Sequence, residues 1–348
     1  MAFSTGELRA AEHVLVRIHS DAGIVGVAEA PARPMTYGES QASIAAAIER
    51  WIAPALVGQD PFAVERHAAA TAWLVANNTA KGAVDIALWD IVGQVLGVPC
   101  HRLMGGYAEK VRVTHMLGFG EPAALAEEAL EMTKQDGITA FKLKVGVDLA
   151  IDVAACRAVR LAVGPEALLY LDANHGYGPE EAISACRAMA EYGVAWIEEP
   201  TPASDFLGRQ RLVSRLDIPV LGDESCATLP DVAREVSNGA AQMISIKPAR
   251  TGFTVSKRIL GLCVGLGARV LCGNQLDGQV GTAATVAFAA AHEATASMPA
   301  ELSHYVIQES DLLTEPLRIV DGHIAARDRP GLGLVIDESA LAHFRVEL

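Results

Sequence analysis

A regular alternation of short apolar runs and Ala- and Leu-rich amphipathic segments, which starts at residue 111, constrains the fold of this chain most. Short β-branched runs are typical of buried strands, and each is followed by a stretch with helical periodicity, for example at residues 122–135, 150–163, 180–191, 229–236, 253–266 and 278–292. We predict eight strands, at residues 111–116, 140–145, 168–172, 195–198, 219–223, 243–247, 269–272 and near 300–302. Eight strands in such a span predict an α/β fold of the TIM-barrel type rather than a doubly wound sheet.

The residues before this region have a different texture. Two alternating runs within residues 13–30 flank a turn signal at 21–23, which predicts a hairpin, and Ala-rich periodic segments follow to residue 97. We therefore predict an α+β domain at 1–105 and the barrel at 106–309. The tail, 310–348, is expected to return to the first domain, with strands at 317–320 and 331–336.

Composition excludes several classes of protein. The net charge of -14 disfavours nucleic acid and anionic membranes as partners. The six cysteines are scattered, with no pairs at zinc-site spacing, and no signal peptide or membrane-spanning run is present, so we expect a cytoplasmic protein. Gly-x-Ser-x-Gly, Walker and dinucleotide-binding motifs are absent.

Four successive predicted strands end in an ionisable residue. Asp172, Glu198, Asp223 and Lys247 follow apolar runs and lie roughly 25 residues apart, about one βα unit each. Because parallel barrel strands share one carboxyl-end face, the three acids are expected to converge there. A single acid at a strand end is more often a helix cap or a surface residue, but three in phase favour a common site.

Three converging carboxylates repel one another unless a cation lies among them. Ligation by oxygen atoms from few side chains favours Mg²⁺, or Mn²⁺, over zinc, and leaves coordination positions for water and substrate. The sequence therefore predicts a metal site at Asp172, Glu198 and Asp223.

Two further lysines lie on the second predicted strand. Alternation places Lys142 and Lys144 on one face, and the apolar residues between and beside them favour an inward direction, although a solvent-facing pair is the commoner reading of an isolated Lys-x-Lys. Burial and a cationic neighbour would both lower a lysine pKa. Since the second strand lies opposite the sixth, Lys144 and Lys247 would flank a substrate carboxylate whose α-proton a metal makes more acidic. One lysine could remove a proton and the other deliver one.

The motifs around these residues together resemble the enolase superfamily, and within it the muconate-lactonizing subgroup of the mandelate racemase/muconate lactonizing enzyme family. The resemblance covers almost the whole chain, including residues 83–90, 103–106 and 330–334. Five motifs carry it: Lys142-Leu-Lys144, Leu-Asp172-Ala-Asn, Ile-Glu198-Glu-Pro, Gly-Asp223-Glu-Ser and Ile-Lys247-Pro-Ala.

The resemblance implies a (β/α)7β barrel with an α+β capping domain, Mg²⁺ at the three acids, and Lys144 and Lys247 as the acid/base pair. Lys142 would orient substrate or depress the pKa of Lys144, and Glu301, which resembles the eighth-strand acid of muconate cycloisomerases, would bind substrate or tune a pKa. Glu224 and Asn174 are placed for auxiliary contacts or loop capping. A homo-oligomer, either a dimer or an octamer, is also implied.

The overall reaction stays open at this point. The resemblance implies Mg²⁺-dependent removal of the α-proton of a small carboxylate through an enolate, by an isomerase that is a cycloisomerase or a racemase/epimerase. A dehydratase of the o-succinylbenzoate synthase or hydroxy-acid type is the alternative, and an inactive binding barrel is the non-enzymatic one. Glu301 favours the cycloisomerase branch, while the Asp-x-Asp of dipeptide epimerases is missing from the eighth strand.

The start of the sequence departs from the family pattern, because Met1 falls where the first capping strand should already have ended. Either that strand is missing or the true start lies upstream. Tyr37 and Phe3 lie in the two capping segments that usually reach substrate, and are candidate substrate contacts.

Overall fold

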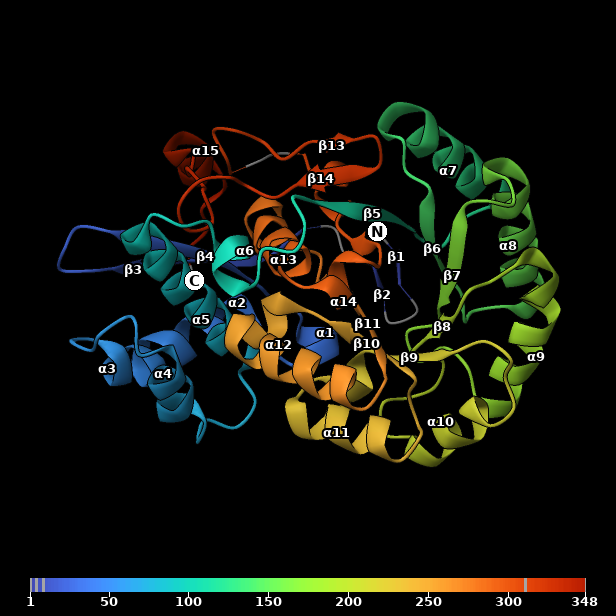
Figure 1. The fold of residues 1–348 in the computed structure, drawn as a ribbon. Helices are drawn as coiled ribbons and strands as arrows, with labels where there is room; N and C mark the ends of the chain where they lie inside the picture. The colour runs from blue at the N-terminus through green and yellow to red at the C-terminus, as the bar shows by residue number, and fades with distance from the viewer. Residues whose placement is uncertain (1, 4–5, 8–9, 310–311, 348) are drawn as a thin grey trace.

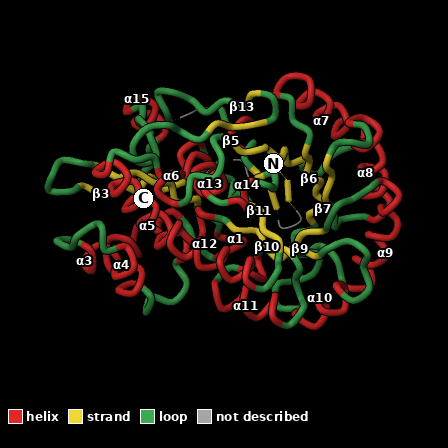
Figure 2. Tube along the Cα trace, viewed as in Figure 1, coloured by secondary structure: helices red, strands yellow, loops and turns green. Residues whose placement is uncertain are grey.

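The structure, a computed structural model, describes every residue except 1, 4–5, 8–9, 310–311 and 348, and no side chain before residue 10. Its larger part is a barrel whose strands run side by side from β5 to β11, with β12 paired to β5 and lying beside β11 (Figures 1 and 2). The barrel strands are β5 Lys110–Leu117, β6 Ala140–Lys144, β7 Leu168–Asp172, β8 Ile197–Glu198, β9 Val220–Gly222, β10 Met243–Ile246, β11 Arg269–Cys272 and β12 Ala300–Glu301.

A helix follows each of the first seven barrel strands. These helices are α7 Pro122–Asp136, α8 Leu149–Val163, α9 Pro179–Met189, α10 Phe206–Val213, α11 Leu229–Ser237, α12 Pro248–Gly265 and α13 Gln279–Ala291. Short elements extend or connect them, namely η2 Ala190–Tyr192, η3 Glu224–Cys226, α14 Glu293–Ala296 and η4 His304–Ile307. All eight predicted strands and the predicted (β/α)7β arrangement are therefore confirmed.

Register places the ends of the strands at the same level. Lys144 is paired with Asp172 between β6 and β7, and Asp172 with Glu198 between β7 and β8. Deeper in the barrel, alternation directs apolar and aromatic side chains inward. These form a separate buried cluster at Tyr170, Trp196, Leu221, Met243 and Leu271, in which the rings of Tyr170 and Trp196 stack with their centroids 4.5 Å apart. The barrel is thus a packed core below a charged upper layer.

The capping part precedes the barrel in sequence and lies beside α12 and α13 (Figure 1). The antiparallel strands β3 and β4 form the predicted hairpin, and the 19-residue helix α5 packs against β4 and α12. The elements are β1 Ala2–Phe3, β2 Gly6–Glu7, β3 His13–His19, β4 Val25–Pro31, α1 Pro34–Tyr37, α2 Gln41–Ala47, η1 Ile48–Ile52, α3 Ala53–Leu56, α4 Val64–Thr71, α5 Asn78–Leu96 and α6 Cys100–Met104.

The tail differs from expectation in two respects. The first predicted strand becomes a small hairpin, β13 Ile319–Val320 and β14 His323–Ala325, and β14 pairs with β5 of the barrel rather than with the capping hairpin. Residues 331–336 form only isolated bridges, at Gly331 and Ile336. This segment nevertheless packs on the capping hairpin, with Leu334 and Ile336 against Val27, and α15 Glu338–Phe344 follows it. No helix among the described residues is long and apolar enough to cross a membrane.

Candidate active site

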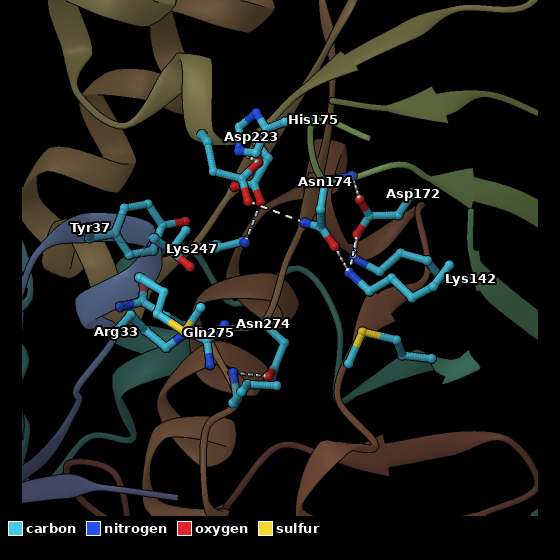
Figure 3. A pocket seen from close by; sticks show the side chains of 16 residues that line it. Arg33, Tyr37, Lys142, Asp172, Asn174, His175, Asp223, Lys247, Asn274 and Gln275 are labelled. Carbon is cyan, nitrogen blue, oxygen red and sulfur yellow. Dashed lines mark hydrogen bonds and ion pairs between the residues drawn. The ribbon is translucent and has the colours of Figure 1, made fainter. Parts of the chain in front are cut away.

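A cavity of about 90 Å³ opens at the carboxyl ends of the barrel strands, beneath the capping segment that follows β4 (Figure 3). Capping residues from Arg33 to Tyr37 form one side. In Figure 3, Arg33 and Tyr37 lie across the pocket from Lys142 and Asp172. The residues that line the cavity are Arg33, Met35, Thr36, Tyr37, Met116, Lys142, Lys144, Asp172, Asn174, His175, Asp223, Glu224, Lys247, Asn274, Gln275 and Leu276. The side chain of Phe3 lies outside the described residues.

The structure brings the three predicted acids together. Asp172, Glu198 and Asp223 come from the ends of β7, β8 and β9, neighbouring strands of the barrel, and no more than 1% of any of them is exposed. The three acids are close enough to interact, since the charges of Asp172 and Asp223 both raise the pKa of Glu198.

On one side of the cavity, two lysines of β6 share one carboxylate, which belongs to Asp172 of β7. The Lys142 ammonium lies 2.9 Å from Asp172 Oδ2 and 3.3 Å from Glu198 Oε2, and the Lys144 ammonium lies 2.6 Å from the same Asp172 oxygen. Lys144 also donates to Asn174 Oδ1, whose amide in turn donates to Glu224 Oε1 at 3.2 Å. Asn174 is therefore a partner of a lysine, as well as a residue of the loop after β7.

On the other side, β9 and β10 supply a carboxylate held between two cations. Lys247 Nζ donates to Asp223 Oδ2 at 2.5 Å, and Arg250 Nη1 donates to Asp223 Oδ1 at 3.0 Å. The same Arg250 nitrogen donates to the Tyr37 hydroxyl at 2.8 Å. This connects the capping segment to the barrel wall.

Glu301, the predicted eighth-strand residue, closes the floor of the site. Its Oε1 lies 2.7 Å from Lys142 Nζ and accepts a hydrogen bond from the Tyr170 hydroxyl at 2.9 Å. Its Oε2 accepts from the Asn274 amide at 3.1 Å. Glu301 is absent from the residues that line the cavity, so in this structure it acts on Lys142.

The lowered pKa that the sequence predicted for the second-strand lysines is wrong for Lys142. Burial lowers the pKa of Lys142, but the charges of Asp172, Glu198 and Glu301 outweigh this and raise it well above its usual value. Burial likewise lowers the pKa of Lys247, and the charges of Asp223, Tyr37 and Glu224 raise it overall. The sequence showed that Lys142 and Lys144 are close to each other. It could not show how many carboxylates lie near each ammonium group, and these carboxylates determine the direction of the pKa shift.

Comparison with known proteins identifies the family of this chain. Residues 1–105 match the N-terminal domain of the mandelate racemase / muconate lactonizing enzyme family, and residues 124–340 match the enolase C-terminal domain-like family. The chain belongs to the mandelate racemase / muconate lactonizing enzyme family. It is an isomerase of the enolase superfamily, because its relatives are cycloisomerases, racemases and epimerases over nearly their whole length.

Three of these enolase superfamily relatives show the range of reactions. A crystal structure of muconate lactonizing enzyme from Mycobacterium smegmatis complexed with muconolactone is 48% identical, with a TM-score of 0.98, over 99% of this chain and 95% of that one. Muconate cycloisomerase 1 of Rhodococcus opacus is 32% identical over 97% of this chain and 92% of its own. The L-Ala-D/L-Glu epimerase of Bacillus subtilis is 30% identical over 93% and 89%.

The donor set of this family member suits a hard divalent cation, although the described residues contain no group of His, Cys, Asp or Glu already arranged around one. All six oxygens of the three acids accept hydrogen bonds, from Lys142, Lys144, Lys247, Arg250 and the Asn174 amide. A cation would have to displace some of these donors. Burial, followed by the charge of Asp172, raises the pKa of Glu198 well above its usual value, so this carboxylate lacks enough positive charge nearby. Three buried carboxylates fit Mg²⁺ or Mn²⁺ in chemistry.

Sequence reasoning missed two cations of the site. Arg250 is 1% exposed and contacts Asp223, yet an arginine three residues into a helix looks like an ordinary surface charge. Arg33 is in the capping segment that the resemblance indicated, but nothing in the sequence directs it into the cavity. The motif Lys247-Pro-Ala-Arg250 was the available signal for Arg250, since the first turn of a helix that follows a catalytic strand borders the site.

Proposed function

We propose that this isomerase is a divalent-metal-dependent cycloisomerase that interconverts an unsaturated dicarboxylate and its lactone through an enolate. The observation that carries the proposal is the position of Lys144 and Lys247. Lys144 is the last residue of β6 and Lys247 directly follows β10, two strands that are four places apart in a ring of eight, and both lysines line the cavity that contains Asp172 and Asp223. Similarity to the muconolactone-complexed structure supports the choice of reaction.

In the lactone-forming direction, an oxygen of one substrate carboxylate adds to the carbon–carbon double bond conjugated with the other carboxylate. The new C–O bond forms as the electron pair of the double bond moves to that second carboxylate, giving an enolate. A lysine ammonium, Lys144 or Lys247 according to the face presented, then gives its proton to the α-carbon. In the reverse direction the same lysine, as the amine, removes that proton.

Asp172, Glu198 and Asp223 are the residues that would hold the metal, and when bound it would stabilise the negative charge of the enolate. Lys142 is held by Asp172, Glu198 and Glu301. We assign it the role of keeping a positive charge beside the substrate carboxylate, with Glu301 fixing its position.

The charges of the site favour a dianionic substrate. With every carboxyl group ionised, the five acids of the site, Asp172, Glu198, Asp223, Glu301 and Glu224, balance its five cations, Lys142, Lys144, Lys247, Arg250 and Arg33. A divalent cation would add two positive charges to this balanced set, and two substrate carboxylates would neutralise them. We assign the second carboxylate to Arg33, the guanidinium on the capping side of the cavity.

A racemase or epimerase is the second candidate. A lysine on each side of the cavity suits transfer of a proton from one face of an α-carbon to the other, and the Bacillus subtilis relative is named as an epimerase. The two candidates differ in one product: only cycloisomerisation forms or opens a lactone.

The experiment incubates the protein with Mg²⁺ in D₂O and, separately, cis,cis-muconate, muconolactone, N-succinylamino acids and L-Ala-L-Glu. We expect lactone formation from muconate, with one deuterium at the α-carbon, and no activity in EDTA. Deuterium exchange and inversion in the acylamino acids or the dipeptide, without lactone chemistry, would favour the second candidate. Inactivity on the whole panel, with Asp223→Asn binding Mg²⁺ as the parent does, would contradict both.

The domain boundaries at residues 105 and 309 stay a prediction, as does assembly into a dimer or octamer. Light scattering after size-exclusion chromatography would measure the number of subunits.

A further inference from the structure

Glu199 follows the candidate ligand Glu198 directly and has an unusual environment. Its side chain is fully buried, and its backbone φ of 33° lies in the left-handed region, which is uncommon for residues other than glycine. It is absent from the residues that line the cavity. Burying a carboxylate and holding its backbone at a positive φ both cost free energy, so other contacts must stabilise Glu199 in this position. Those contacts indicate what the residue does.

One carboxylate oxygen of Glu199 holds the start of the turn that carries Asp223. Oε2 accepts from the Asp223 amide at 2.7 Å, from the Ser225 amide at 3.2 Å and from the Ser225 hydroxyl at 2.9 Å. Converging backbone amides of this kind form an anion-binding site, here filled by a side chain of the protein itself. The turn closes with the Cys226 amide donating to the Asp223 carbonyl at 3.0 Å. Glu199 therefore fixes the backbone from which the Asp223 side chain projects.

The backbone of Glu199 joins the neighbouring strand ends as well. Its carbonyl accepts from the His175 amide at 2.9 Å, after β7, and its own amide donates to the Leu221 carbonyl at 2.9 Å, in β9. The segments that carry Asp172, Glu198 and Asp223 thus meet at this one residue.

Behind Glu199 lies a buried ion-pair network outside the cavity. Its Oε1 is 3.7 Å from Arg209 Nη1, and the Arg209 guanidinium donates two hydrogen bonds of 3.0 Å to Glu235. Arg209 also donates to the carbonyls of Pro202 and Ala203. The network anchors Glu199 to α10 and α11, and Glu235 shares the network without contacting Asp223.

We propose that Glu199 is a positioning residue for the metal site, which holds the Asp223 backbone so that the Asp223 carboxylate faces Glu198 and Asp172. This rests on the proposed function in so far as Asp223 is taken as a metal ligand. Loss of the contact would leave Asp223 present but poorly oriented, and groups that orient metal ligands typically contribute about 10–100-fold to metal affinity.

The test compares Glu199→Met, Glu199→Gln and Glu235→Met with the parent. Mg²⁺ affinity is measured by titration calorimetry on the metal-free protein, and melting temperature on the same samples. We expect Glu199→Met to bind Mg²⁺ about 10–100-fold more weakly. Glu199→Gln should recover most of this affinity, because its amide oxygen can still accept from Asp223 and Ser225. Glu235→Met should melt at a lower temperature, since it removes the carboxylate that accepts two hydrogen bonds from Arg209, yet bind Mg²⁺ as the parent does.

Two results would overturn the inference. One is Mg²⁺ binding by Glu199→Met equal to the parent, while Asp223→Asn loses it. The other is a loss of affinity in Glu235→Met as large as in Glu199→Met, which would mean general destabilisation. If Asp223→Asn itself binds Mg²⁺ normally, the proposed function fails instead. If Glu199→Met does not fold, Ser225→Ala replaces it in the test, because this variant removes the hydroxyl that donates to Glu199. We expect a smaller loss of Mg²⁺ affinity than for Glu199→Met, and Mg²⁺ affinity equal to that of the parent would contradict the inference.

Discussion

The two sides of the cavity contain the same kinds of residue and are attached to the rest of the molecule in different ways. The β6–β7 side, with Lys142, Lys144 and Asp172, is built from barrel strands, and its helices α7 to α9 lie across the barrel from the capping helices α3 to α5 (Figure 1). The β9–β10 side, with Asp223 and Lys247, is joined to the capping part through Arg250 and Tyr37.

A second connection lies behind the β9–β10 side. At Gly252, where φ is 65°, α12 departs from helical geometry, and Asp85 of α5 accepts from the Thr254 amide at 2.9 Å as the helix resumes. Thr254 Oγ1 also accepts from Trp89 Nε1 at 2.9 Å. Lys247 is thus joined to the capping part through Asp223, Arg250 and Tyr37, whereas Lys144 bonds to Asp172 and Asn174 of the barrel, so the two lysines are not equivalent.

The largest expected effect is on catalysis by the two lysines. Lactone formation needs one proton at one face, so Lys144→Ala and Lys247→Ala should lose unequal amounts of kcat, about 10²–10⁴-fold for the proton donor and less for the other. Solvent deuterium incorporation per turnover would be measured alongside kcat. If both variants lose the same amount of kcat, and deuterium exchange at both faces of the α-carbon is abolished, the reaction is a two-base racemisation. The two sides of the cavity would then be equivalent in catalysis.

Much of this site could be predicted from sequence, because the barrel repeats one simple pattern. Alternation within a strand and one ionisable residue at each strand end are local features, and they sufficed to bring Asp172, Glu198 and Asp223 together. The outcome for Lys142 was missed, because the charges of Asp172, Glu198 and Glu301 act on one ammonium together and outweigh burial, and Glu301 is 159 positions further along the chain. Contacts of that kind are set by how the barrel closes.

The connection through Arg250 and Tyr37 was missed for a related reason. It joins residues 213 positions apart, and neither belongs to a periodic pattern. Glu199 could be predicted in part. The Glu-Glu-Pro motif showed two adjacent acids, and alternation along the strand predicts that the second one points away from the cavity. What it holds there depends on the turn after β9, which sequence does not specify.

The next effect concerns how the capping part recognises substrate. Arg33→Met keeps the length of the side chain and removes its charge, so the KM for muconate should rise about 10-fold or more, as expected when a charged hydrogen bond is lost. Muconate monomethyl ester, with one carboxylate, should show a smaller change. Arg17→Met, which removes a partly exposed arginine that is paired with Glu338 far from the cavity lining, is the control. Equal changes for both substrates would contradict the assignment of the second carboxylate to Arg33.

A smaller effect is expected from breaking the contact between the two parts. Tyr37→Phe keeps the ring beside Arg250 and removes the hydroxyl, a loss of about 0.5–1.5 kcal/mol. Hydrogen exchange of residues 34–37 should become faster in the substrate-free protein, where direct contact with substrate plays no part. Tyr107→Phe, at an exposed tyrosine, should leave exchange there unchanged. Unaltered exchange in Tyr37→Phe would mean that the capping segment is held by other contacts.

The smallest effect tests the connection at Thr254. Thr254→Val keeps the shape and removes the hydroxyl that donates to Asp85 Oδ1, so we expect about 1–2 kcal/mol of destabilisation and a melting temperature lower by about 1–3 °C. The matched control is Thr133→Val on α7, whose hydroxyl bonds only to the carbonyls of Ala129 and Ile138.

The deficit of Thr254→Val should also depend on pH, unlike that of the control. Burial raises the pKa of Asp85 to about 6, while its hydrogen bonds with Thr254 lower it. A carboxyl group whose pKa is raised by folding costs stability as pH rises from its unfolded value, about 4, through its folded value. Removing one donor raises the folded value further, so the deficit of Thr254→Val should grow between pH 5 and pH 8. A deficit that stays constant across this range would show that Asp85 does not ionise in the folded protein, and that the contact between α5 and α12 is a neutral hydrogen bond.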